Sequence, residues 1–134
     1  MFKYLRTMNS HVSAPEICYL TGSGTSTIYA NTVYTVDDSG YLSSSAEPGR
    51  TRYIALESKA KGKEMEVKCL RVMPGMVFET FGNSNHEFFK VGLRGTFSEG
   101  VGNALEYFIE GGTDLEIVAH HYSETPDDVM VTFI

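Results

Sequence analysis

Residues 51–81 carry the longest continuous run of strand-like pattern in the chain, TRYIALESKAKGKEMEVKCLRVMPGMVFETF. Side chains on a β-strand point alternately to opposite faces, so a strand with one buried face alternates apolar with polar residues. Met65 and Val67 alternate in this way with charged residues, which predicts a half-buried strand. The run as a whole predicts several short strands in series, and we expect it to form a scaffold rather than a catalytic centre.

Turns and one irregularity divide this run. Residues 51–57 have mixed character on both faces, which predicts a strand covered on both sides, and a lysine-rich turn follows it. The alternation slips where Cys69 and Leu70 stand together, and a slip of one residue predicts a β-bulge. Pro74 and Gly75 end that strand, because proline cannot donate a hydrogen bond to the ladder.

Short strand patterns separated by turn residues fill the rest of the chain. They lie at residues 16–21, 28–36, 41–42, 87–93, 103–110, 113–122 and 129–134. Residues 103–110 could also form one or two helical turns with Asn103 as N-cap, but the hairpin-like flanks favour a strand. Many short strands without a long helical pattern are typical of an all-β barrel or sandwich.

The length of 134 residues predicts one domain. We predict a small β-barrel or barrel-like sandwich over residues 16–134 and a candidate partner-binding arm over residues 1–15. The segment FKYLRT at residues 2–7 is either an edge strand or part of that arm, and an arm of this kind can add as a strand to the sheet of a partner. The candidate partner-binding residues are Phe2, Tyr4, Leu5 and Arg6.

The net charge of −6 bears on the choice of partner. Proteins that grip phosphates normally carry a basic excess, and the one basic cluster, Lys59, Lys61 and Lys63, is diluted by neighbouring glutamates. We therefore interpret this cluster as a solvated turn and predict no nucleic-acid partner. No apolar run approaches the ~20 residues of a membrane helix, and the first residues lack the apolar core of a secretory signal, so we predict neither membrane insertion nor that route of export.

The chain has two cysteines, Cys18 and Cys69, and no CxxC motif. Cys69 lies at alternate spacing with Met65 and Val67, which favours a buried free thiol. A disulfide between Cys18 and Cys69 is the alternative, although nothing in the sequence indicates an oxidising compartment.

The histidines and paired carboxylates do not match a known catalytic or metal-binding pattern. His120 and His121 are adjacent, and adjacent strand residues point to opposite faces, so the two cannot bind one ion without a distorted backbone. The aspartate pairs at residues 37–38 and 127–128 fall in predicted turns, where such side chains bond their own backbone. The glycine-rich loops match no phosphate-binding motif. We predict no catalytic residue, no cofactor and no metal.

A small β-barrel enzyme or ligand binder is an alternative of a different class. It would need polar groups or a metal trio facing inward. His86, Glu87 and His120 are the candidate trio, with His11 as a further histidine, and bound metal in an elemental analysis would favour this alternative.

Residues 50–80 resemble a pattern of small proteins encoded beside the major capsid protein in tailed bacteriophages and prophages. The pattern is a strand like TRYIALES, a glycine-containing turn and then VKCLRVMPGMVFET, and the hairpin TVYTVDDSGYL and the closing DDVMVTFI are also similar. The chain thus resembles capsid decoration (cement) proteins, comparable in a broad sense to the lambda-type head decoration protein. Residues 92–112, which contain NALEYFIEGG, depart from the pattern.

The resemblance implies a structural protein without catalytic residues. It implies binding to the major capsid protein on the outer surface of an expanded shell, which the protein would hold against internal DNA pressure. It also implies self-association, with trimers by analogy, and a location on the virion after assembly in the host cytoplasm. A head-fibre or tail-adaptor subunit is the alternative place in the virion.

Overall fold

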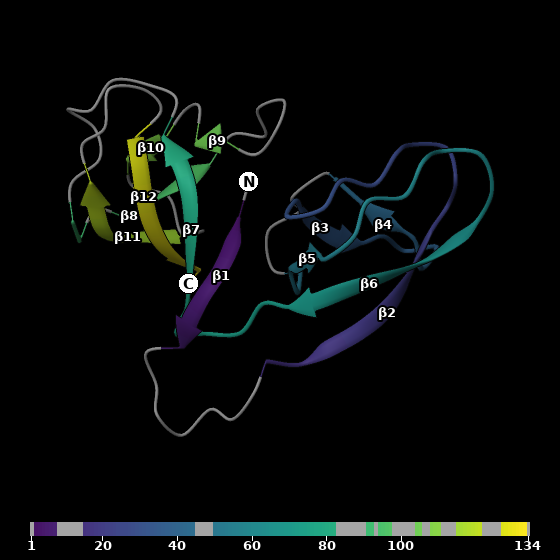
Figure 1. The fold of residues 1–134 in the computed structure, drawn as a ribbon, viewed down its shortest axis with the longest axis horizontal. Coiled ribbons are helices and arrows are strands. Elements are labelled where there is room, and N and C mark those ends of the chain that lie inside the picture. The colour runs from purple at the N-terminus through teal and green to yellow at the C-terminus, as the bar shows by residue number, and fades with distance from the viewer. Residues whose placement is uncertain are drawn as a thin grey trace. The chain divides into compact units, whose positions relative to one another are not determined.

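The computed structural model describes residues 2–7, 15–44, 50–82, 91–92, 94–97, 104–105, 108–110, 115–121 and 127–133. All the regular elements in these residues are β-strands (Figure 1), which confirms the all-β prediction. The chain divides into two compact units. Unit 1 comprises Met1–Val12 and Met73–Ile134, and unit 2 comprises Ser13–Val72. Unit 2 is therefore an insertion within unit 1, where the sequence pattern predicted one domain with an arm over residues 1–15.

Unit 1 contains the seven-stranded sheet. Its strands are β1 (Lys3–Thr7), β7 (Met76–Gly82), β8 (Arg94–Phe97), β9 (Ala104–Leu105), β10 (Phe108–Glu110), β11 (Leu115–His121) and β12 (Asp127–Phe133). The order is β1-β7-β12-β11-β8-β10, all antiparallel, and β9 pairs with β7 in parallel. Residues 2–7 thus form an edge strand, one of the two predicted alternatives.

The core of unit 1 is built from β7 and its neighbours. Met76, Val77 and Phe78 of β7 are at most 1% exposed, and Ile117 of β11 is fully buried. The buried hydroxyl of Thr132 donates to the carbonyl oxygen of Met76 at 2.8 Å, so the polar group that β12 brings into this region is satisfied. The start of β7, which follows the predicted break at Pro74 and Gly75, therefore lies in the core of unit 1.

Unit 2 contains the five-stranded sheet. Its strands are β2 (Ile17–Gly22), β3 (Val33–Val36), β4 (Leu42–Ser43), β5 (Tyr53–Ala55) and β6 (Met65–Arg71), in the order β2-β6-β5-β3-β4. An isolated bridge between Thr21 of β2 and Tyr41, which precedes β4, brings the two ends of this order together. The sheet is therefore curled into a half-barrel, in agreement with the barrel-like prediction.

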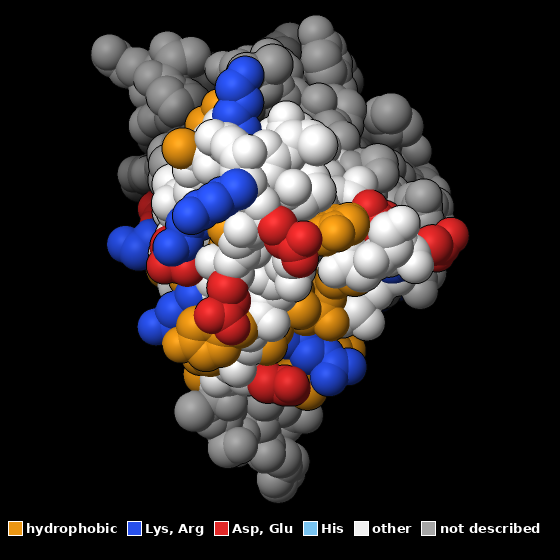
Figure 2. Space-filling view, turned by 90° about the vertical axis from the view of Figure 1, so that its right-hand side faces the viewer, with side chains coloured by type: hydrophobic (Ala, Val, Ile, Leu, Met, Phe, Trp, Pro, Cys, Tyr) orange, Lys and Arg blue, Asp and Glu red, His pale blue; other side chains and the backbone are white. Residues whose placement is uncertain are grey.

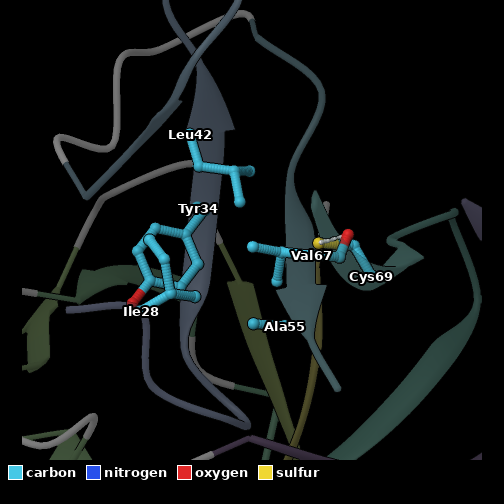
Figure 3. Close-up of a cluster of buried hydrophobic side chains, with 6 residues drawn as sticks. All are labelled: Ile28, Tyr34, Leu42, Ala55, Val67 and Cys69. Atoms are coloured by element: carbon cyan, nitrogen blue, oxygen red, sulfur yellow. Dashed lines mark hydrogen bonds between the residues drawn. The ribbon is translucent and has the colours of Figure 1, made fainter. Parts of the chain in front are cut away.

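The concave face of the unit 2 sheet encloses its hydrophobic core (Figure 3). The cluster consists of Ile28, Tyr34, Leu42, Ala55, Val67 and Cys69. The Tyr34 hydroxyl oxygen accepts a hydrogen bond from the backbone N–H of Tyr29 at 3.0 Å. The ring therefore contributes apolar surface to the core while its polar end remains bonded.

The bulge predicted at Cys69 and Leu70 is wrong. Both residues are buried, but β6 pairs with β2 and β5 through them without a shift of register. Ile54 and Ala55 of β5 are likewise 1% and 0% exposed although they point to opposite faces, which confirms that β5 is covered on both sides. The strand is shorter than the predicted residues 51–57, at Tyr53–Ala55. Consecutive apolar residues here reflect burial of both faces. A register shift instead lies in β1, between Tyr4 and Arg6.

The region before β3 is less regular than predicted. The strand expected over residues 28–36 is confined to β3, because Asn31 has a left-handed conformation with φ of 63° that interrupts it. The hairpin after β3 is confirmed. Asp37 Oδ1 accepts hydrogen bonds from the backbone N–H groups of Ser39 and Tyr41, both at 2.9 Å, as expected of an aspartate at a turn.

Strands replace some predicted turns in unit 1. Asp127 and Asp128 were predicted in a turn but belong to β12, where their backbone pairs with β7, because ladder pairing outweighs the local turn preference. Strands β9 and β10 fall within residues 103–110, so strand was the correct choice there. Strand β8, which lies within residues 92–112, was not predicted. The strand predicted over residues 87–93 lies outside the described residues, except for a turn at 91–92.

Candidate interaction surfaces

The four predicted partner-binding residues lie in or beside β1, at the edge of the unit 1 sheet. Phe2 is 1% exposed, and the Tyr4 ring lies edge-to-face with Phe78 at 5.9 Å between centroids. The Tyr4 ring therefore packs within unit 1, and the Phe2 side chain is buried rather than exposed to a partner. Leu5 is 37% exposed and is available to a partner, while the side chain of Arg6 lies outside the described residues.

The edge of β1 is irregular at Leu5. Tyr4 pairs with Phe78 and Arg6 pairs with Val77, so Leu5 is an extra residue opposite β7. A bulge disrupts the regular ladder and is one way in which edge strands avoid uncontrolled pairing. We infer that a partner would contact β1 through the Leu5 side chain rather than by backbone pairing along the strand.

Strand β2 of unit 2 presents a second surface, which lies outside the predicted partner-binding residues. It is the first strand in the order of its sheet, and its Ile17 and Tyr19 side chains are 44% and 61% exposed. Both point to the convex face, because the intervening Cys18 packs against the core cluster on the concave face. The adjacent convex-face residue on β6 is Lys68, which is paired with Tyr19 and exposed.

The backbone of β2 has one paired and one open side. The N–H of Arg71 donates to the carbonyl oxygen of Glu16 at 3.0 Å, so the backbone groups of even-numbered residues point toward β6. In an antiparallel ladder the direction alternates, and the N–H and C=O groups of Ile17 and Tyr19 therefore point away from β6. Within the described part of the chain, β4 approaches that side of β2 at its C-terminal end, where Thr21 bridges Tyr41, and no strand pairs with it at Ile17 and Tyr19.

The sequence pattern of residues 16–21 indicates part of this result. EICYLT has apolar residues on both faces of the predicted strand, so one apolar face had to be exposed or covered by something else. Which of the two faces is exposed depends on the sheet that β2 joins, and periodicity alone does not provide that information.

Figure 2 shows one face of the molecule, on which hydrophobic side chains lie in separate groups among charged ones.

The two cysteines lie directly opposite each other on β2 and β6, and both are free thiols. The Cys18 thiol lies 3.7 Å from the carbonyl oxygen of Cys69. Burial raises the pKa of the Cys69 thiol to about 12, with smaller contributions from Cys18 and Glu57. Burial also raises the pKa of Cys18, and Glu16 adds to this effect. Since the thiolate is the nucleophile, both cysteines are poor nucleophiles at neutral pH.

The described residues contain no group of three or more metal-binding side chains. His120 and His121 lie on β11, but their side chains are outside the described residues, as are His11, His86 and Glu87. The predicted metal trio is thus not among the described side chains. The described part of the structure also has no helix long and apolar enough to cross a membrane.

Comparison with protein-family models, curated proteins and solved structures found no match to this chain.

Proposed function

We propose that this protein is a structural component of a bacteriophage virion that binds the outer surface of the capsid and stabilises the shell. The observation that carries the proposal is the resemblance of residues 72–80, VMPGMVFET, to capsid decoration proteins. In the structure this segment contains the turn at Pro74 and Gly75 and most of β7. Because β7 pairs with β1, it also holds in place the N-terminal residues that we expect to meet the shell.

Leu5 is the described side chain through which β1 would touch the shell. It stands at a bulge on the sheet edge and is 37% exposed, so contact with an apolar site on the capsid would remove further surface from water. Tyr4 serves this contact indirectly, because its ring packs against Phe78 and so fixes β1 against β7. One exposed leucine gives a weak contact, but many copies on one particle multiply weak contacts through avidity.

Co-sedimentation with purified mature shells of the phage that encodes the chain tests this function. We expect the wild-type protein to pellet with the shells and Leu5→Asp to bind about tenfold more weakly, because a charge at the contact must be desolvated. Val91→Asp is the matched control, since Val91 is also an exposed apolar residue of unit 1, at 67%. A wild-type protein that remains wholly in the supernatant would refute the proposed function. Unchanged binding by Leu5→Asp would exclude β1 from the contact.

A further inference from the structure

We propose that two copies of this protein associate by antiparallel pairing of β2 with β2 about a two-fold axis. In this register Cys18 stands opposite the second copy's Cys18. The five-stranded sheets of the two copies then continue into each other through their β2 edges. The association concerns the free protein and does not depend on shell binding.

The open backbone groups of β2 fit this register. Ile17 would stand opposite the second copy's Tyr19, and Tyr19 opposite the second copy's Ile17. The N–H and C=O groups of both residues point away from β6, as the bond between Arg71 and Glu16 establishes. Each Ile17–Tyr19 pair can therefore exchange both backbone hydrogen bonds, and Cys18 occupies the non-bonded pair at the axis.

The side chains also complement themselves in this register. Ile17 and Tyr19 lie on the same convex face and are 44% and 61% exposed. The two-fold axis therefore creates two copies of an aromatic–β-branched pair, a combination that stabilises antiparallel sheets. Pairing also covers apolar surface that unit 2 leaves in contact with water.

Features of this chain limit the paired segment at both of its ends. In the same register Pro15 stands opposite the second copy's Thr21. Proline has no N–H to donate, and the open side of Thr21 is already engaged by the bridge to Tyr41. The pairing is thus limited to residues 16–20, and neither end requires the loss of an existing bridge.

Charge favours a second copy of this chain as the occupant. Residues 17–22, ICYLTG, contain no charged side chain, so pairing of the strand with itself places no like charges directly opposite each other. Edge strands are usually blocked by a lysine, a proline, a bulge or an inward charge. The described β2 has none of these between residues 17 and 20, whereas β1 has its bulge at Leu5.

A single-cysteine variant tests the register. Cys69→Ala leaves Cys18 as the only cysteine of the chain. Opposite residues in a non-bonded pair have Cα atoms ~4.5 Å apart, which lies within the range that a disulfide spans. Oxidation with copper phenanthroline in air should therefore give a disulfide-linked dimer that dithiothreitol reverses. A variant that remains monomeric on a non-reducing gel while its circular dichroism matches the wild type overturns the register.

Sedimentation equilibrium of the unmodified protein tests the association itself. Wild-type protein should show a reversible dimer, and Tyr19→Lys should raise the dimer dissociation constant by about tenfold or more, because it places a charge at the paired edge. Tyr29→Lys is the matched control, since Tyr29 is also 61% exposed in unit 2 but lies outside β2, and it should dimerise like the wild type. A wild-type monomer up to about 100 μM, or equal effects of the two substitutions, overturns the proposal.

Discussion

Phe2→Ala tests whether the N-terminal segment is part of the folded core of unit 1. Phe2 is 1% exposed and directly precedes β1. A buried phenylalanine removes roughly 150–250 Å² from water, which at about 25 cal/mol per Å² amounts to an upper bound of roughly 4–6 kcal/mol. Alanine retains part of that surface but leaves a cavity, so we expect the free energy of unfolding of unit 1 to fall by about 3–5 kcal/mol.

Urea unfolding followed by circular dichroism measures this loss, and hydrogen exchange of the β7 amides reports on unit 1 specifically, because β7 pairs with β1. Leu5→Ala is the matched control in the same segment and should cost about 1 kcal/mol or less, since Leu5 is 37% exposed. If Phe2→Ala cost no more than Leu5→Ala, the segment would be an arm that does not pack on unit 1, and the reasoning would be refuted.

Three further predictions concern unit 2. Gly24→Ala should lower the thermal midpoint clearly more than Gly40→Ala. Both glycines have φ of +86°, but a Cβ at Gly24 would collide with the backbone of Lys63, whereas a Cβ at Gly40 meets nothing within 4 Å. Equal midpoints would contradict the close approach. Cys69 has a pKa raised by burial from 9.0 to about 12, so its contribution to stability is fully present below pH 9 and is lost as the pH rises toward 12. Denaturation midpoints at several pH values should show a smaller alkaline loss in Cys69→Ala than in the wild type, and identical losses would contradict this. Asp37→Ala removes two turn hydrogen bonds and should cost about 1–2 kcal/mol in urea unfolding; no loss would show that the turn does not need them.

Sequence periodicity was sufficient to predict strands and turns where the local pattern and the burial in the folded protein agree. The alternation around Met65 and Val67 predicted β6, the Asp37 turn predicted the β3–β4 hairpin, and Pro74 with Gly75 predicted the break before β7. In each case a local preference, from side-chain alternation or turn chemistry, favours the same conformation that the final sheet requires.

Sheet partners could not be predicted in this way. Cys69 and Leu70 suggested a bulge because alternation does not distinguish a register shift from burial of both faces. The division into two units depends on β1 pairing with β7 across the inserted unit 2, which is a long-range choice. For the same reason the sequence did not show that Phe2 is buried and that Tyr4 packs on Phe78, and the exposed face of β2 was not identified.

Among all experiments, a cryo-electron microscopy map of the intact phage particle tests the central claim of capsid binding most directly. We expect density for this protein on the outer surface of the shell, with β1 facing the major capsid protein. Density confined to the tail or the head fibres would contradict it, as would a particle that lacks the protein altogether.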